Sequence, residues 1–171
     1  SDKLVTGGHA TLRVWDVDFA NRKINPTDVA FGAVRREFRN IAIDPTDYYA
    51  YIGTASGDVV CIQLQGPKNY KMAGPQKKFS NGVLSLTLNG DGDLLIGSGG
   101  GSVALLSKID LHVIKQVEVQ GAVTSVSTLG EHYFIGTTYI TLYYLHSLSF
   151  HLLTSHFLPP LPLPHPIHTS T

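Results

Sequence analysis

The residues Asn89, Asp91 and Asp93 have the alternating spacing with which a calcium-binding loop begins. The sixth position of such a loop requires glycine and the twelfth requires a bidentate glutamate. Here those positions hold Leu94 and Gly100. Because both requirements fail, the Asn-Gly-Asp-Gly sequence is interpreted as a hairpin turn, for which it supplies residues that tolerate positive φ.

A second candidate is the glycine-rich run 97–101, Gly-Ser-Gly-Gly-Gly, which is similar to a phosphate-binding loop. Such a loop continues into Gly-Lys-Ser/Thr and the start of a helix. Here no lysine follows directly, and residues 103–106 are typical of a strand. We therefore predict a tight turn between two strands, and no cofactor-binding residues.

Histidines and nucleophiles give no site either. His146, His151 and His156 are five residues apart, so neither a strand nor a helix would turn all three towards one metal ion. Ser80 and similar hydroxyls have no recognisable base and orienting partner. The sequence therefore predicts no metal ligand, no catalytic residue and no enzymatic activity.

Basic residues form the remaining candidate site. Four lysines lie in a stretch without acids between Asp58 and Asp91, and an arginine pair lies upstream; the candidate partner-binding residues are Lys68, Lys71, Lys77, Lys78, Arg35 and Arg36. One interpretation is a solvated surface. The other is electrostatic steering towards an acidic protein surface. Nucleic acid is not predicted, because few aromatic residues are interleaved as stacking platforms.

A repeated pattern must position these residues. Four times, an apolar strand ends in two small residues, and a second apolar strand starts six residues after the first of them; the strand pairs are 4–7 with 12–15, 51–54 with 59–62, 95–98 with 103–106, and 134–137 with 142–145. Successive copies are 47, 44 and 39 residues apart. This period predicts a β-propeller with one blade per repeat, in which small residues let inner strands approach closely.

Composition agrees with a folded all-β protein. Of 171 residues only 15% are charged, and 13 basic residues balance 13 acidic ones. The single cysteine, Cys61, is predicted to be a small buried side chain, and it suits a reducing compartment. No apolar run predicts a secretion signal or a membrane span, so no membrane partner is expected.

The repeats predict about three and a half four-stranded antiparallel blades, since the first copy lacks an opening strand. We expect a partial propeller over residues 1–157, with blade units at about 1–34, 35–80, 81–120 and 121–157. Residues 158–171 are rich in proline and are expected to form a disordered tail. An incomplete ring predicts further blades outside this sequence.

The repeat resembles the WD-repeat family. Trp15-Asp16 matches its signature dipeptide, and Asp44-Pro45 matches its first hairpin turn. The strings Thr-Leu-Arg-Val-Trp at 11–15 and Asn-Arg-Lys-Ile at 21–24 resemble WD-repeat proteins of motile cilia more specifically. Other copies depart from the family, having aliphatic residues in the tryptophan slot and no Gly-His pair, so the family's hydrogen-bonded tetrad is not assigned.

That resemblance covers about residues 2–137 and implies a non-catalytic scaffold. Its ciliary members imply a place in the axoneme, inside doublet microtubules of cilia and flagella, with tubulin and neighbouring inner proteins as partners. The alternative is a cytosolic WD-repeat adaptor, such as a ubiquitin-ligase substrate receptor. After Glu131 the chain has no charged residue, which predicts that it departs from the family after about Thr137.

Overall fold

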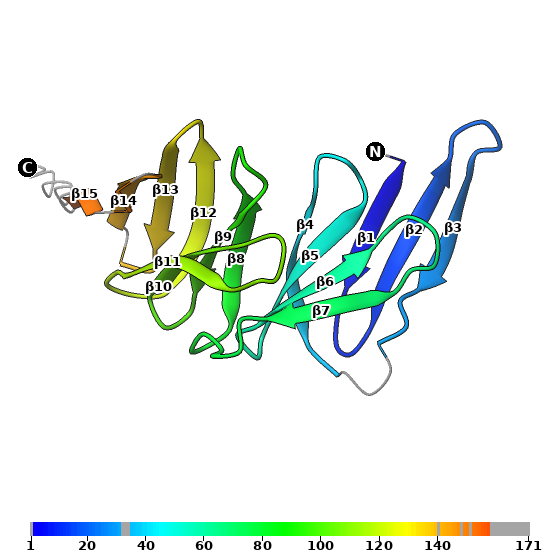
Figure 1. The fold of residues 1–171 in the computed structure, drawn as a ribbon, viewed down its shortest axis with the longest axis horizontal. Helices are drawn as coiled ribbons and strands as arrows, with labels where there is room; N and C mark the ends of the chain where they lie inside the picture. Colours follow the sequence, from blue (N-terminus) through cyan, green and yellow to red (C-terminus); the bar gives the residue numbers. More distant parts are fainter. Residues whose placement is uncertain (1, 32–34, 140, 148, 151, 158–171) are drawn as a thin grey trace, which may run out of the picture.

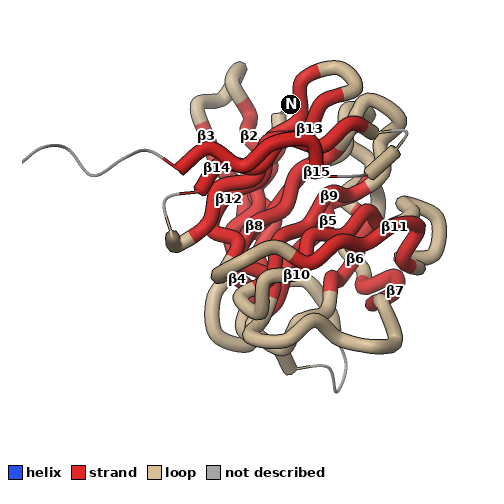
Figure 2. The backbone as a smooth tube through the Cα atoms, turned by 90° about the vertical axis from the view of Figure 1, so that its left-hand side faces the viewer, coloured by secondary structure: helices blue, strands red, loops and turns tan. Residues whose placement is uncertain are grey.

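The computed structural model describes residues 2–31, 35–139, 141–147, 149–150 and 152–157. Within this part the chain forms strands joined by loops, without a helix (Figure 2). The first two sheets contain β1 (Lys3–Gly7), β2 (Leu12–Asp18), β3 (Lys23–Asp28), β4 (Phe38–Ile43), β5 (Tyr49–Thr54), β6 (Val59–Gln63) and β7 (Tyr70–Gly74). The next two contain β8 (Val83–Leu88), β9 (Leu94–Ser98), β10 (Ser102–Leu106), β11 (Val113–Glu118), β12 (Val123–Leu129), β13 (His132–Thr137), β14 (Thr141–His146) and β15 (Leu152–Phe157).

Each sheet is an antiparallel meander made from one continuous stretch of chain. The strand orders are β1-β2-β3, β4-β5-β6-β7, β8-β9-β10-β11 and β12-β13-β14-β15. The four sheets lie side by side in chain order (Figure 1). This confirms the all-β partial propeller, with three strands in the first sheet and four in each of the others.

Neighbouring sheets meet mainly through the first strand of each sheet. Contacts between sheets join β1 to β4, β4 to β8, and β8 to β12, with further contacts from β5 and β9. The small-residue strands were predicted to be inner strands that approach closely. In the three four-stranded sheets they are second, after β4, β8 and β12, whereas in the first sheet the small-residue strand β1 comes first.

The small residues nevertheless serve the predicted purpose of close approach. A Cβ atom at Gly53 would lie 2.7 Å from Cγ1 of Val83, and one at Gly97 would lie 2.2 Å from Cγ1 of Val123. Val83 and Val123 open the next sheet in each case. The glycine of one sheet therefore makes room for the first valine of the following sheet.

The first strands also share an irregularity. The pairing of β4 with β5, β8 with β9, and β12 with β13 shifts register just after Phe38, Val83 and Val123. Each shift is a β-bulge that leaves one residue unpaired and bends the strand. The bulge thus recurs where each sheet begins and packs against its predecessor.

The core consists of three clusters, one between each pair of neighbouring sheets. In β9, Leu94 and Ile96 pack towards β4–β7, whereas Leu95 packs towards β12–β15. The middle sheets are therefore buried on both faces, and β9 reads as an uninterrupted apolar run. Cys61 is buried as predicted.

The outer sheets are less buried than the middle ones, because among the described residues each has one face without a neighbouring sheet. Trp15, the only tryptophan in the repeated apolar slot, is half-buried and faces away from the core residues Leu12 and Val14. Its indole nitrogen donates to Oγ1 of Thr6 at 2.8 Å. In β13, buried Tyr133 and Ile135 alternate with half-buried Phe134, so residues 134–137 are less buried than predicted.

Strand structure extends to Phe157. The expected disordered tail, residues 158–171, lies outside the described residues. The part of the chain that the structure describes contains no helix long and apolar enough to cross a membrane.

Candidate partner-binding site

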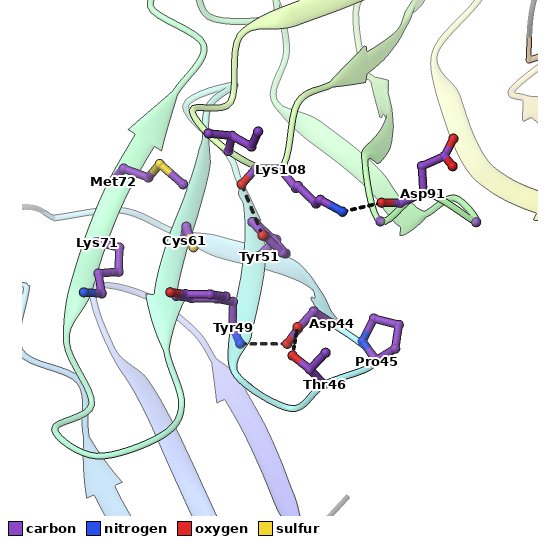
Figure 3. A pocket seen from close by; sticks show the side chains of 13 residues that line it. Asp44, Pro45, Thr46, Tyr49, Tyr51, Cys61, Lys71, Met72, Asp91 and Lys108 are labelled. Atoms are coloured by element: carbon purple, nitrogen blue, oxygen red, sulfur yellow. Dashed lines mark hydrogen bonds between the residues drawn. The ribbon is translucent and has the colours of Figure 1, made fainter.

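A groove of about 700 Å³ lies where the β4–β7 and β8–β11 sheets diverge (Figure 3). It opens at the end of the sheets that carries the β4–β5, β8–β9 and β10–β11 connections. Its lining residues are Asp44, Pro45, Thr46, Tyr49, Tyr51, Cys61, Lys71, Met72, Gly90, Asp91, Gly92, Lys108 and Ile109.

The floor of the groove is a row of side chains across three paired strands. Tyr51, Cys61 and Met72 are register partners on β5, β6 and β7. Burial raises the pKa of the Cys61 thiol to about 12, with a further contribution from the charge of Asp44, so the thiol is neutral at physiological pH. Burial also raises the pKa of Tyr51, whose hydroxyl donates to the carbonyl oxygen of Lys108 at 3.3 Å.

Residue size explains why a groove forms at this interface. At the next interface, Leu105 occupies the position equivalent to Cys61, and Phe150 occupies the position equivalent to Leu111. Both Leu105 and Phe150 are buried in the cluster between the β8–β11 and β12–β15 sheets. Cys61 lines the groove, and its side chain is smaller than that of Leu105, so it fills less of the space between β4–β7 and β8–β11.

A β-bulge brings Lys71 to the groove. The pairing of β6 with β7 shifts register between Cys61 and Ile62, so that Lys71 is the extra residue on β7. Regular alternation would send Lys71 and Met72 to opposite faces. The bulge re-aims one side chain, and both residues line the groove.

Most polar groups at the rim already have partners within the protein. The carboxylate of Asp44 accepts from the backbone nitrogens of Tyr48 and Tyr49 at 2.8 and 2.7 Å, and from the hydroxyl of Thr46. The ammonium of Lys108 donates to the carbonyl oxygen of Asp91. Within the described chain, neither the ammonium of Lys71 nor the carboxylate of Asp91 makes a salt bridge or side-chain hydrogen bond.

The six predicted basic residues do not form one patch. Lys68 lies in the connection before β7; it donates to the carbonyl oxygen of Leu64 at 2.7 Å and lies 3.6 Å from a carboxylate oxygen of Asp16. Lys71 lies on β7 at the groove. At the opposite end of the sheet lie Arg35, Arg36, Lys77 and Lys78, all of which are exposed except the partly buried Arg36.

The buried carboxylate of Asp58 gathers two of these cations. Its oxygens lie 3.0 Å from Nε of Arg36 and 3.4 Å from Nζ of Lys78, and it also accepts from the hydroxyl of Thr54. Burial raises the pKa of this carboxyl. The hydrogen bonds from Thr54 and Arg36, together with the charges of Arg36 and Lys78, lower the pKa by a larger amount. The net pKa lies below the ordinary value, so Asp58 is ionised at neutral pH.

Sequence reasoning missed this Asp58 cluster and the groove. The repeats contain a signal for the cluster. Thr54 and Asp58 flank the turn within their strand pair, and the position of Asp58 is occupied by Thr11, Ser102 and Thr141 in the other copies. Asp58 is the only charged residue among those four positions. The groove had a weaker signal, since Cys61 is the smallest residue in a slot otherwise filled by Val14, Leu105 and Tyr144.

The two predicted turns are confirmed. Residues 89–93 connect β8 to β9, and Oδ1 of Asn89 accepts from the backbone nitrogens of Asp91 and Asp93 at 3.0 and 2.9 Å. Residues 99–101 connect β9 to β10. Both segments close hairpins between neighbouring strands of one sheet.

Of the three histidines considered in the sequence, His146 lies beside a fourth, His132, and the carboxylate of Glu131. His146 lies 3.4 Å from a carboxylate oxygen of Glu131, and His132 packs against it with ring centroids 5.4 Å apart. Among the described residues, no three His, Cys, Asp or Glu side chains are arranged to hold a metal ion.

Comparison with known proteins gives consistent relatives. The chain is 36% identical to the cilia- and flagella-associated protein 52 of Chlamydomonas reinhardtii over 148 residues, which are 83% of this chain and 24% of that protein. It is 35% identical to the Homo sapiens protein of that name over 139 residues, 80% of this chain and 22% of that protein. No family model matches the chain.

The similarity is not confined to the first three blades. The Bos taurus protein of the same name is 34% identical over 164 residues, covering 91% of this chain and 26% of that protein. A match of that length extends past Thr137, where the chain was predicted to depart from the family. The chain spans about a quarter of the length of the curated relatives it matches.

Proposed function

We propose that this WD-repeat propeller segment, related to cilia- and flagella-associated protein 52, is a structural interaction module of the ciliary axoneme. Within the axoneme we assign it to the inside of doublet microtubules, with tubulin and neighbouring inner proteins as partners. An all-β repeat fold and relatives named for cilia and flagella fit a non-enzymatic scaffold.

The similarity to these ciliary relatives is the observation that carries this proposal. Relatives from an alga and from mammals share 34–37% identity with 80–91% of this chain. The aligned region therefore includes most of the four-sheet unit described above.

Exposed basic residues are the proposed contacts with tubulin. Arg35 and Lys77 lie at one end of the β4–β7 sheet and project from connections between sheets. Lys71 lies at the other end, while Lys68, Arg36 and Lys78 are held by carboxylates. Arg35 and Lys77 are thus the cations best placed to meet an acidic protein surface.

Co-sedimentation with polymerised tubulin and with isolated doublet microtubules tests this function. We expect the chain to pellet with both, and to pellet less as salt screens exposed charges. Reversing Arg35→Glu and Lys77→Glu together should weaken binding about fivefold, as for two exposed ion pairs. Lys23→Glu, on exposed β3, supplies a control with the same change of charge as either single reversal, Arg35→Glu or Lys77→Glu.

Failure to co-sediment with either polymer would contradict the axonemal proposal and favour the cytosolic adaptor. Equal weakening by the Lys23→Glu control and by a single reversal at Lys77 would show that overall charge matters, rather than contacts at Arg35 and Lys77.

A further inference from the structure

We infer that the groove between the β4–β7 and β8–β11 sheets binds an extended protein segment that carries an apolar side chain next to a carboxylate. This inference rests on the proposed scaffold function and specifies the chemistry of one of its partners.

The apolar part of the inference follows from the groove's lining. Its floor and walls include Tyr51, Cys61, Met72 and Pro45, and Ile109 is 79% exposed at the rim. A volume of about 700 Å³ admits one large side chain and the flanking backbone, rather than a folded domain. Pro45 and Ile109 are exposed and Met72 is partly exposed, so an apolar anchor lying against these three residues would remove apolar surface from water.

The carboxylate follows from the charge that remains unmatched. Asp44 is saturated by the turn that it stabilises, and Lys108 is held by the carbonyl oxygen of Asp91. Lys71 makes no salt bridge or hydrogen bond within the described chain, although the bulge directs it to this groove. A carboxylate of the partner would accept a charge-assisted hydrogen bond from the ammonium of Lys71.

The charges favour a protein segment over a polyanion. Lys71 is on β7, and Asp91 is in the β8–β9 connection, so the two uncompensated charges lie on opposite sheets that border the groove (Figure 3). A nucleic acid strand would place repeated phosphates near Asp91, where like charges repel. A segment with one carboxylate meets Lys71 and leaves Asp91 solvated.

The interface between the β8–β11 and β12–β15 sheets shows how the groove is closed at an equivalent place in the fold. There Leu105 replaces Cys61, Ile114 replaces Lys71, and Lys115 replaces Met72 at the equivalent positions. Lys115 donates to the carbonyl oxygen of Ser147 at 3.0 Å, joining the two sheets at that point. The same fold therefore supplies matched substitutions that close the groove or remove its charge.

Selection from a displayed random nonapeptide library on the immobilised full chain tests the inference. We expect enriched peptides to share Asp or Glu beside a large apolar residue. Fluorescence anisotropy with the resynthesised peptides should show about tenfold weaker binding to Lys71→Ile, as expected for loss of a charge-assisted hydrogen bond. Replacing the peptide carboxylate by its amide should weaken binding to the wild type but not to Lys71→Ile.

Cys61→Leu should abolish peptide binding, because the larger side chain fills the floor of the groove. Ile109→Ser changes an exposed residue at the rim, so it should weaken peptide binding while leaving the fold intact. Lys77→Glu, at the opposite end of the sheet, should bind peptides as the wild type does. Absence of enrichment, enrichment of peptides without carboxylates, or unchanged binding to both Lys71→Ile and Ile109→Ser would overturn the inference. Co-sedimentation of these variants with doublet microtubules reports separately on the scaffold function.

Discussion

The two middle sheets and the two outer sheets share one repeated sequence pattern but differ in burial. In the middle sheets β5 and β9 are buried along almost their whole length, because a sheet lies against each face. In the outer sheets the equivalent strands β1 and β13 alternate between more and less exposed residues. A repeat therefore specifies the strands, whereas the neighbours decide which side chains become core.

The largest expected difference in unfolding free energy is between alanine substitutions at equivalent positions of a middle and an outer sheet. Leu95 is fully buried, while Phe134 at the equivalent position packs on Tyr144 with ring centroids 5.6 Å apart on a less covered face. Leu95→Ala should reduce the free energy of unfolding by about 3 kcal/mol. Phe134→Ala should cost only about 1 kcal/mol. Urea denaturation measures both; equal losses would break the distinction.

The next effect compares the polar ends of the sheets. Asp58→Asn should cost about 3 kcal/mol at neutral pH, because Arg36 and Lys78 would lose their buried counter-charge. Thr141, the equivalent residue in the last sheet, makes only a weak hydrogen bond to the carbonyl oxygen of Tyr139 at 3.4 Å. Thr141→Val should therefore cost less than about 1 kcal/mol.

The pH dependence of the Asp58 variant has a definite sign. The folded-state pKa of Asp58 is lowered, so its stabilisation is present above the unfolded pKa of about 4 and is lost as pH falls through the folded pKa. The stability difference between wild type and Asp58→Asn should shrink below about pH 4. Thermal melts between neutral and acidic pH measure it, and a constant difference would contradict the ionised assignment.

A smaller effect is expected at Trp15. A fully buried tryptophan would cost about 3–5 kcal/mol when truncated. Because Trp15 is half-buried on an uncovered face, Trp15→Ala should cost about 1 kcal/mol, mostly through the hydrogen bond to Thr6 and the stacked Arg13. A loss of several kcal/mol in chemical denaturation would mean that this face is covered in solution.

The smallest effect concerns exposed charges. Arg35→Glu and Lys77→Glu should each change the free energy of unfolding by less than about 0.5 kcal/mol, since neither residue is buried. Lys78→Glu should destabilise more, because it places a carboxylate next to Asp58. Differential scanning fluorimetry of the three variants ranks them, and a melting temperature for Lys77→Glu as low as that for Lys78→Glu would contradict this division.

Much of the fold could be predicted because its signals are local. The six-residue offset after Thr6, Gly53, Gly97 and Gly136 locates a strand pair in every sheet, and residues 89–93 form the expected hairpin turn. The identity of the innermost strands was not local. It depends on which strand meets the neighbouring sheet, and Val83 and Val123 reveal this only through their contacts with glycines of the preceding sheet.

The candidate site was less predictable for the same reason. Counting basic residues grouped Lys68 with Lys77, although β7 separates them, and it treated Lys78 and Arg36 as free although both meet Asp58. The groove depends on a bulge at Lys71 and on the small size of Cys61 relative to Leu105. The bulge does not appear in the sequence, and the small size of Cys61 is apparent only when the four copies are aligned.

The contact between a glycine of one sheet and the first valine of the next has a consequence for local opening. Among the described residues, the main contacts of each sheet are with its immediate neighbours, so the molecule behaves as a short linear array in which the stability of each sheet depends on the next. Amide hydrogens of β5 and β9 should then exchange with solvent most slowly, and those of β1 and β13 sooner. Gly97→Ala would place a Cβ atom against Val123 and weaken the contact between the last two sheets. The amide hydrogens of these two sheets should then exchange on different timescales.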